Sequence, residues 1–594
     1  MSKEIKNRLM ALLSAMKEEN IDYYLISTGD FHNSEYVGDY FKVREYYSGF
    51  TGSNGSLLVS ENEVGLWTDG RYFVQAENEL KGTGITLFRM GNKDVPTIAE
   101  YLKKQCENKE ITLGLDGRVV SKSYIESIEK KCEGKITINA LQDLAGDLWE
   151  NRPAMSCENI WIHTQEYSGI SLQEKVSMLR KELDKKKADA FFTSKLDAIM
   201  WLYNVRGADV ECNPVALSYS YVTKDKAYLF LQKNALDEKT KEYFEKHDVT
   251  LKEYCDIFSF LKEEPSQKVA LNKSEVSYSI WETISDRHTI VELDNPLEEW
   301  KSVKNENEIK QMKEFFVKDS VAVCKFLYDV KTKGVSDEME AAAIIDGYRR
   351  EIDGFLDLSF PTISAYKENA AMMHYEATKV SYADIKKEGM LLVDSGGQYK
   401  GATTDVTRTV ILGDISQEER KYFTLVAAGM LRLQNACFIK GCTGRNLDIL
   451  ARQPLWEEYV DYKCGTGHGV GCCLNVHEGP QSIRWMYSAE KKETVLKAGM
   501  TVTDEPGVYF AGRFGIRTEN VLLVKELVEN EDGEFLGFEP LTFVPIDLEG
   551  IDIAYMEAKD IRYLNAYHKA VYDTISPYLS EDVCMWLKEA TKPL

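Results

Sequence analysis

The sequence lacks any apolar run near the length of about 18 residues that a membrane-spanning helix needs, so we expect no transmembrane span. It also lacks the apolar core of a secretory leader, because residues 1–20 show the spacing of an amphipathic helix. Positive charge is scarce, since 73 Lys and Arg residues face 96 Asp and Glu residues and give a formal net charge of −23. This charge argues against nucleic acid or an anionic membrane as the main partner.

A cysteine pairing pattern is missing as well. The twelve cysteines are scattered, Cys472 and Cys473 are adjacent, and no zinc-type C-x-x-C spacing occurs. This distribution favours reduced thiols in a cytoplasmic protein. The composition that remains is ordinary for a soluble globular chain, with 44% apolar and 28% charged residues. The acidic balance fits a soluble acidic enzyme, but it fits plain solubility equally well.

A length of 594 residues exceeds what one hydrophobic core supports, and the patterns divide the chain into three regions. Residues 1–160 alternate helix and strand patterns, with a linker-like segment at 151–155 near their end. Residues 161–299 repeat this plan, because aligning Ile21-Asp22 with Ala188-Asp189 superposes one helix–strand unit on the other. We therefore expect two related α/β domains in tandem.

Residues 300–594 have a different pattern. A continuous helix is expected from 300 to 331, and a second helix is expected after the N-cap pattern at 336–338. Strands and turns dominate from 389 onward, which predicts an α+β domain. The last segment, from 560 onward, has a helical pattern and carries a tryptophan, so we expect it to pack onto this domain.

Histidine is scarce too, with eight residues in the chain. His468 lies between glycines, which leave its imidazole uncrowded. His477 follows nine positions later, and His374 lies in the segment Ala371-Met-Met-His-Tyr375. On the residues alone, His374 is more often a packed or surface histidine, and His477 could form a local ion pair with Glu478.

Two aspartates are predicted to meet in a hairpin. The segment 390–410 has strand-like flanks and a polar, glycine-containing middle, so its turn is expected near 399–400. This turn places Asp394 and Asp405 opposite each other, with Cβ atoms about 5 Å apart. Bare carboxylates repel at that distance and need cations or a shared proton. Two solvated aspartates at a turn are the alternative on this segment alone.

Glu505 and Glu519 form a second acidic pair, on predicted adjacent strands at 501–505 and 516–523. The four carboxylates and the imidazole of His468 suit two divalent cations. Carboxylate-rich sites favour manganese or magnesium, and an imidazole also admits cobalt or zinc. Two such ions about 3.5–4 Å apart can hold and acidify one water and polarise a substrate carbonyl.

Five residues, in this order, resemble the metal ligands of the pita-bread metallopeptidases of family M24: Asp394, Asp405, His468, Glu505 and Glu519. Within this family the chain resembles the Xaa-Pro aminopeptidases (aminopeptidase P) in their long three-domain form. The matching motifs run through nearly the whole chain: LWTDGRYF at 66–73, WLYNVRG at 201–207, DVTR at 405–408, GTGHGVG at 465–471, NVHEGP at 475–480 and DEPG at 504–507.

The resemblance implies two creatinase-type α/β domains, residues 1–160 and 161–299, followed by a pita-bread catalytic domain at 300–594. It implies a cytoplasmic homodimeric exopeptidase that removes the N-terminal residue from peptides with proline second. It also implies two divalent ions, with manganese favoured. Prolidase, which cleaves only dipeptides, is the alternative enzyme. A non-catalytic pita-bread module that binds protein partners is the alternative from another class.

The resemblance also implies ligand roles. Asp405 and Glu519 would bridge the two ions. Asp394 would complete one ion site, and His468 with Glu505 would complete the other. Glu505 would in addition carry the proton from the bridging water to the leaving amine of proline.

Substrate contacts are implied in the same way. His374 and His477 would hydrogen-bond the substrate and steady the tetrahedral intermediate, and His468 would border the same pocket. Arg71 reads by itself as a surface turn residue, but it matches a substrate-binding arginine of the family. Arg517, two positions before a predicted ligand, would orient its acidic neighbours.

Cys464 departs from the family pattern, because many relatives have a histidine of the substrate pocket at this position. A thiol close to the ions would make the enzyme sensitive to oxidants. We expect peroxide to reduce the peptidase activity of the parent enzyme and to leave the Cys464→Ser variant more active. Equal loss of activity in both proteins would contradict this expectation.

Overall fold

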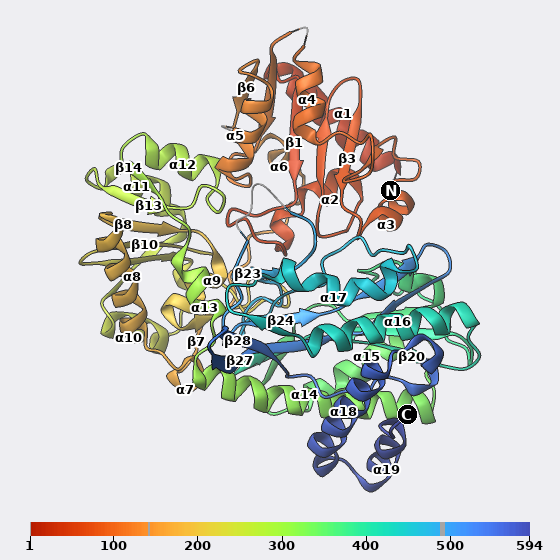
Figure 1. The fold of residues 1–594 in the computed structure, drawn as a ribbon. Coiled ribbons are helices and arrows are strands. Elements are labelled where there is room, and N and C mark those ends of the chain that lie inside the picture. Colours follow the sequence, from red (N-terminus) through yellow and green to blue (C-terminus); the bar gives the residue numbers. More distant parts are fainter. Residues whose placement is uncertain (1, 108, 141–142, 488–492) are drawn as a thin grey trace. The chain divides into compact units, whose positions relative to one another are not determined.

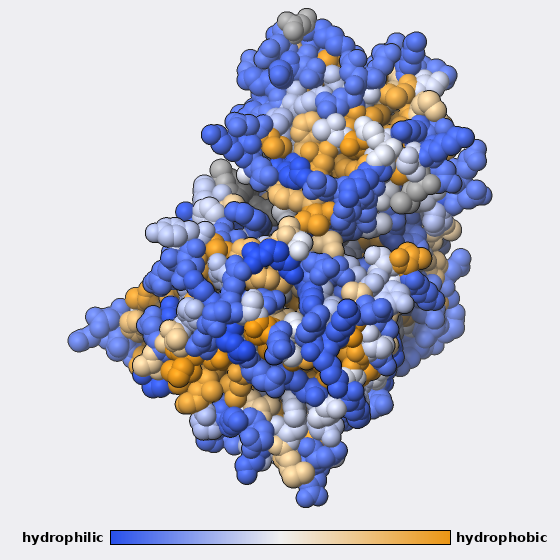
Figure 2. All heavy atoms as spheres, turned by 90° about the vertical axis from the view of Figure 1, so that its right-hand side faces the viewer, coloured by the Kyte–Doolittle hydropathy of each residue, from blue (hydrophilic) through white to orange (hydrophobic). Residues whose placement is uncertain are grey.

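The computed structural model describes residues 2–107, 109–140, 143–487 and 493–594. The chain forms two compact units, Met1–Thr164 with Ile170–Leu297 and Gln165–Gly169 with Glu298–Leu594. In Figure 1 the first unit runs from red to yellow-green and the second from green to blue, apart from the orange segment Gln165–Gly169 of the second unit. Figure 2 shows a face on which hydrophilic side chains predominate and hydrophobic ones lie in scattered groups. Within the described ranges, no helix is both long enough and apolar enough to cross a membrane.

The first unit contains two six-stranded sheets. The first has the order β4 (Thr86–Arg89), β3 (Val64–Thr68), β2 (Ser56–Val59), β1 (Tyr23–Ser27), β5 (Ile111–Leu115) and β6 (Ile136–Asn139). The second has the order β12 (Val249–Glu253), β11 (Ala227–Leu231), β10 (Ser218–Thr223), β8 (Ala190–Thr193), β13 (Lys268–Leu271) and β14 (Thr289–Glu292). In each sheet the central strand, β1 or β8, pairs antiparallel with one neighbour and parallel with the other.

Helices connect these strands. Those of the first sheet are α1 (Ser2–Glu18), α2 (Val43–Ser48), α3 (Phe73–Glu79), α4 (Ile98–Gln105), α5 (Lys122–Lys131) and α6 (Leu144–Asp147). Those of the second are α8 (Leu172–Lys186), α9 (Leu196–Tyr203), α10 (Glu238–Lys246), α11 (Ile257–Glu263) and α12 (Tyr278–Ser285). Both halves are therefore α/β, as the alternating pattern predicted.

The predicted internal repeat is confirmed by matching hydrogen bonds. Asp22 and Asp189 each stand directly before the central strand of their sheet. The carboxylate of Asp22 accepts the backbone N–H of Thr112 at 2.9 Å, and that of Asp189 accepts the N–H of Lys268 at 3.0 Å. In each half, an aspartate directly before the central strand thus binds the backbone of the neighbouring parallel strand, β5 or β13.

The second unit combines long helices with small antiparallel sheets. Its helices are α7 (Gln165–Ser168), α13 (Pro296–Ser302, which begins at the end of the first unit), α14 (Glu306–Thr332), α15 (Glu338–Arg350), α16 (Gln417–Gln434), α17 (Gly444–Trp456), α18 (Ala558–Ile575) and α19 (Glu581–Ala590). Its strands are β15 (Phe355–Leu358), β16 (Ile363–Tyr366), β17 (Met390–Ser395), β18 (Gly397–Tyr399), β19 (Ala402–Thr403), β20 (Val406–Ile411), β21 (Cys437–Ile439), β22 (Gly467–Gly469), β23 (Glu478–Ile483), β24 (Thr501–Asp504), β25 (Gly507–Phe510), β26 (Phe514–Arg517), β27 (Asn520–Asn530) and β28 (Gly533–Pro540).

The core of this unit surrounds α16, which is buried along most of its length. Leu564, Tyr567 and Val571 of α18 belong to the same apolar cluster, and Trp586 of α19 packs against it. The C-terminal segment therefore packs as expected. Apolar burial of this kind is the main source of stability in such a domain.

The continuous helix expected at 300–331 is wrong at its start. The structure ends α13 at Ser302 and begins α14 at Glu306. Asn305 causes the break, because its side chain accepts the backbone N–H groups of Asn307 and Glu308 while its own backbone is extended. This capping box replaces the helical hydrogen bonds that a continuous helix would need at that point.

A buried ion pair joins α14 and α15 to the sheet that carries a predicted ligand. Arg349 donates from Nε to Oδ1 of Asp319 at 2.8 Å and from Nη2 to the carbonyl of Ser395 at 3.2 Å. Tyr399 donates to the same Asp319 oxygen at 2.6 Å. Ser395 directly follows Asp394, so this group fixes the strand end where Asp394 lies.

We expect Arg349→Met to lower the free energy of unfolding by about 3–5 kcal/mol, because it leaves Asp319 as a buried, unpaired charge. Arg350→Met is the matched control. Arg350 is 57% exposed and 3.9 Å from Asp346, so its loss should cost about 0–1 kcal/mol. Urea unfolding of both variants measures the difference, and equal destabilisation would contradict the prediction.

Candidate metal centre

Asp394 and Asp405 come from the hairpin of β17 and β20. In this ladder Asp394 lies opposite Thr407, so the predicted direct pairing of the two aspartates is wrong. The turn is centred between Lys400 and Gly401, one residue later than expected. A one-residue shift of the centre moves the register by two, which keeps both aspartates on one face. Asp405 is therefore a diagonal neighbour of Asp394 rather than a direct one.

Glu505 and Glu519 come from a second hairpin. β24 pairs with β27, with Asp504 opposite Asn520, and the chain continues into the ladder of β25 and β26. Glu505 follows β24 and Glu519 precedes β27, so the two glutamates occupy facing positions where the first ladder ends. The predicted pairing of these neighbouring strands is confirmed.

His468 lies in β22 between two glycines, which let neighbouring chain segments approach the backbone closely. A Cβ atom on Gly467 would lie 1.9 Å from the carbonyl oxygen of Thr503, and one on Gly469 would lie 2.2 Å from the side chain of Gln481. Only glycine tolerates such approach. Nδ1 of His468 is 2.9 Å from the carbonyl oxygen of Gly469, which can only accept a hydrogen bond. Nδ1 therefore carries the proton and Nε2 presents a lone pair.

Backbone hydrogen bonds join these three segments. The N–H of Glu519 donates to the carbonyl of Thr407 at 3.1 Å, which connects the second hairpin to the first. The N–H of Glu505 donates to the carbonyl of Thr466 at 2.8 Å, which connects it to the segment of His468. The positions of the acidic groups are thus set by paired backbone rather than by loops.

The predicted ligands converge. One side-chain atom from each of Asp405, His468 and Glu519 lies within 4.8 Å of the others. Nε2 of His468 is 3.4 Å from Oε1 of Glu505 and 3.6 Å from Oδ2 of Asp405. Oδ1 of Asp394 is buried without a hydrogen-bond partner.

Burial and mutual repulsion dominate the electrostatics. Burial, followed by the charge of Glu519, raises the pKa of Asp405 well above its usual value. Burial, followed by the charge of Glu505, does the same to the pKa of Glu519. Burial raises the pKa of Glu505 to about 7, although Arg517 opposes the shift. Arg517 also pairs with Asp394, at 2.5 Å between Nη2 and Oδ2.

These residues fit a pair of divalent cations. Carboxylates with raised pKa values favour added positive charge, since a cation relieves the repulsion that a proton otherwise relieves. Oδ1 of Asp394 has no hydrogen-bond partner among the described residues, and Nε2 of His468 lies next to the carboxylates of Glu505 and Asp405. Four carboxylates with one imidazole form a donor set suited to manganese, cobalt or zinc.

Two hydroxyl groups hold the glutamates, and sequence analysis missed both. Thr407 donates to Oε2 of Glu519 at 2.6 Å and accepts from Nε of Arg517 at 3.1 Å. Thr503 donates to Oε1 of Glu505 at 3.0 Å. Each threonine lies two positions from a predicted ligand along the chain, and two-residue spacing places strand residues on one face. That spacing was the available signal.

The two predicted substrate histidines lie in the second unit. The ring centroid of His477 is 4.3 Å from that of His468, with the planes at 78°. His374 lies in a turn, and the carbonyl of the preceding Met373 accepts from Nη2 of Arg517 at 3.3 Å. The structure thus brings His477 beside a predicted ligand and ties the turn of His374 to Arg517. Their substrate roles stay predictions.

Arg71 belongs to the first unit. Its Nε and Nη2 atoms donate to Asp69 at 3.0 and 2.9 Å, and its Nη1 is 3.4 Å from Oε1 of Glu35. These bonds hold the guanidinium in its turn with 23% of the side chain exposed. Its role in binding substrate stays a prediction.

Cys464 is partly buried and packs, together with Tyr509, against the apolar core around α16. Burial is the main cause that raises the pKa of Tyr509, and Cys464 adds to the shift. The Tyr509 hydroxyl accepts from Nη1 of Arg517 at 2.7 Å. The cysteine therefore lies near Tyr509, which binds the arginine that pairs with Asp394, and its predicted oxidant sensitivity stays a prediction.

Family models cover nearly the whole chain. Models described as the creatinase/prolidase N-terminal domain match residues 8–152 and 151–308. The model of metallopeptidase family M24 matches residues 310–526, and one for the C-terminal region of M24 peptidases matches residues 534–594.

Full-length relatives agree with these matches. A probable Xaa-Pro aminopeptidase P of Paracoccidioides brasiliensis (strain Pb03) is 37% identical, over 100% of this chain and 99% of its own length. One of Pyrenophora teres f. teres is 38% identical, over 99% and 92%. The crystal structure of X-prolyl aminopeptidase from Caenorhabditis elegans superposes with a TM-score of 0.94 at 32% identity, covering 99% of this chain and 100% of that one. That protein is described as a cytosolic enzyme with a di-nuclear active site.

The raised pKa values predict how metal binding depends on pH. In the chelated protein the glutamate and aspartate protons bind more tightly to the folded chain than to the unfolded one. The cluster therefore destabilises the fold increasingly as pH rises from the unfolded value of 4.5 for a glutamate through about 7 for Glu505. We expect the rise in Tm on adding Mn²⁺ to be larger at about pH 8 than at about pH 5.

Differential scanning fluorimetry with and without chelator measures this rise. Glu505→Gln is the matched variant, because it removes one of the shifted groups without changing side-chain size. We expect it to reduce the difference between the two pH values. A metal-dependent rise in Tm that is the same at both pH values would contradict the electrostatic account.

Proposed function

The chain belongs to metallopeptidase family M24 and is a metal-dependent aminopeptidase, and we propose that it releases the N-terminal residue of peptides whose second residue is proline. The observation that carries the proposal is the convergence of acidic side chains and one imidazole from three chain segments. The specificity for proline is supported by the names of the full-length relatives. Proline calls for a dedicated pocket, because its tertiary amide lacks an N–H and its ring fixes φ.

The proposed ligands of two divalent ions are Asp394, Asp405, His468, Glu505 and Glu519. Manganese is the proposed ion, because hard carboxylate donors dominate the set. When bound, a pair of such ions supplies an acidified water and polarises the scissile carbonyl. The protein's own contribution is to hold these donors in a fixed arrangement, through the two hairpins and the hydroxyl groups of Thr407 and Thr503.

Glu505 is the proposed proton carrier. Its side chain is 21% exposed, whereas that of Asp405 is 6% exposed, and before metal binds its pKa is about 7. A group with these properties can take a proton at a carboxylate oxygen from the attacking water and return it to the leaving amine. The hydrogen bond from Thr503 holds Oε1 in place for this exchange.

His477, His374 and Arg71 are the proposed substrate contacts. The ring of His477 lies beside His468, at the edge of the ligand cluster. A ring N–H there can donate to the oxygen on which negative charge develops in the transition state. Arg517 links the turn of His374 to a proposed ligand, since it binds both Asp394 and the carbonyl oxygen of Met373.

Four further features belong to the proposal. The chain acts as a homodimer in the cytoplasm, and the description of the worm relative as cytosolic supports the location. The domain boundaries lie near residues 160 and 300; the matches to the separate family models meet close by, at 151–152 and at 308–310. Light scattering tests the homodimer, cell fractionation tests the cytoplasmic location, and limited proteolysis tests the domain boundaries. Metal analysis of the purified protein tests the fourth, the manganese.

Peptide assays separate this function from that of prolidase. We expect hydrolysis of Xaa-Pro-Xaa tripeptides with release of the first residue, loss of activity with chelator, and recovery with Mn²⁺. Glu505→Gln should lower kcat by about 10²–10⁴, the usual contribution of a general base. Glu526→Gln, an exposed glutamate on β27, is the matched control and should keep its activity.

Cleavage of Xaa-Pro dipeptides alone would reject the proposed specificity in favour of prolidase. Absence of both activity and bindable metal would support the non-catalytic module instead.

A further inference from the structure

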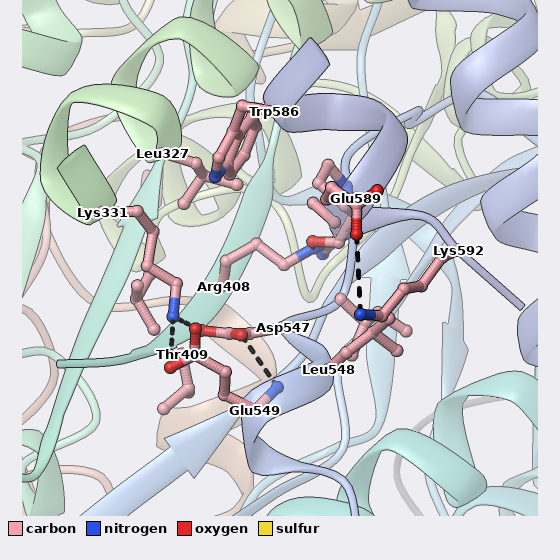
Figure 3. Close-up of a pocket in the computed structure, with 14 residues that line it drawn as sticks. Leu327, Lys331, Arg408, Thr409, Asp547, Leu548, Glu549, Trp586, Glu589 and Lys592 are labelled. Atoms are coloured by element: carbon pink, nitrogen blue, oxygen red, sulfur yellow. Dashed lines mark hydrogen bonds and ion pairs between the residues drawn. The ribbon is translucent and has the colours of Figure 1, made fainter. Parts of the chain in front are cut away.

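A cavity of about 260 Å³ lies within the second unit. Its walls come from α14, β20, the segment 545–549 and α19. Figure 3 shows Leu327 and Trp586 on one side of this space and Leu548 on another, and Val410 and Ala590 add to its apolar lining. None of the proposed metal ligands or substrate contacts lines it.

The charges around the cavity are balanced. Nζ of Lys331 is 2.6 Å from Oδ2 of Asp547 and 3.1 Å from Oε2 of Glu549. Nζ of Lys592 is 3.6 Å from Oε2 of Glu589. The side chains of Glu549, Glu589 and Lys592 are 66%, 75% and 61% exposed. Exposed pairs of this kind are weak, so their charged ends can turn to a ligand at little cost.

We propose that this cavity binds a free α-amino acid with an apolar side chain. The inference rests on the proposed function in one respect, because that reaction releases a free α-amino acid. An apolar cavity of about 150 Å³ holds one benzene ring, so about 260 Å³ has room for a phenylalanine, leucine or tryptophan side chain. The indole of Trp586 offers an aromatic wall for it.

The charged rim selects a zwitterion. Glu589 and Lys592 offer opposite charges 3.6 Å apart, so they match a ligand whose ammonium and carboxylate groups are also close neighbours. A free α-amino acid has this arrangement. A peptide separates its two charges by its length, and a fatty acid or an amine brings only one of them.

The cavity shares a strand with the metal centre. Arg408, which lines the cavity, donates from Nε to the carbonyl of Pro545 at 3.1 Å and from Nη1 to that of Glu519 at 2.5 Å. Thr409, which also lines it, donates to the carbonyl of Arg517 at 2.9 Å. An amino acid in the cavity therefore contacts residues that hold Glu519 and Arg517. Binding there and metal binding must affect each other equally if they are coupled.

Isothermal titration calorimetry on the full chain tests the proposal, once with Mn²⁺ and once with chelator. We expect L-phenylalanine, L-leucine and L-tryptophan to bind at one site in both conditions, and L-lysine and L-glutamate to bind far more weakly. N-acetyl-phenylalanine and phenethylamine each lack one charge and should bind about tenfold more weakly than phenylalanine, as loss of a charge-assisted hydrogen bond predicts.

Two variants locate the site. Ala590→Trp fills the cavity and should abolish binding, with a thermal melt to check its folding. Lys592→Glu removes the cation of the rim and should weaken binding about tenfold. Lys588→Glu is the matched control, because it makes the same charge change four positions earlier, at an exposed residue of α19 outside the lining, and it should bind like the parent.

Several results would overturn the proposal. These are no amino acid binding to the parent, unchanged binding in both Ala590→Trp and Lys592→Glu, or equally tight binding of uncharged indole. Concentration-dependent dimers that Ala590→Trp disrupts, without amino acid binding, would assign the cavity to a second copy instead. Binding that follows the predicted pattern in a protein without peptidase activity would support the site and reject only the proposed function.

Discussion

Repulsion among buried carboxylates is the constraint on which the second unit depends. Asp405 and Glu519 are buried close to Glu505, and burial together with the charges of neighbouring carboxylates, Asp394 among them, raises the pKa of each. Such a cluster opposes folding at neutral pH unless positive charge is added. Two divalent cations supply that charge. The carboxylate repulsion that destabilises the metal-free fold therefore also creates the affinity for metal.

The surrounding structure serves to keep these groups together despite their repulsion. Each acidic pair is placed by a hairpin, and backbone hydrogen bonds of Glu505 and Glu519 join the hairpins to each other and to the segment of His468. Arg517 and the hydroxyl groups of Thr407 and Thr503 then orient individual oxygens. Before metal binds, the same electrostatics raise the pKa of Glu505, the more exposed group, to about 7.

The far side of the same strands is occupied by the C-terminal extension. Arg408 joins the carbonyl of Glu519 to that of Pro545 and to the hydroxyl of Tyr567 on α18. The helix α18 is thereby joined to the residues that place Glu519, and Arg408 also lines the cavity between α14 and α19. Arg408 and Thr409 line this cavity, so a ligand bound there would contact the strand β20, which directly follows Asp405.

Local pattern determined much of this protein. Amphipathic spacing and caps predicted the N-terminal helix, the long helix that ends near residue 331, the helix after 336–338 and the helical C-terminal segment. Repeated order at Asp22 and Asp189 predicted the tandem sheets, and residue type with spacing predicted the acidic groups and His468 as one cluster. The position of the turn centre decided that Asp394 lies opposite Thr407, and the capping side chain of Asn305 decided where the helix breaks. The sequence pattern missed both, because small differences in local energy decide them. Only the tertiary structure placed Thr407, Arg408 and Trp586, because long-range packing brings together residues that the sequence separates by more than a hundred positions.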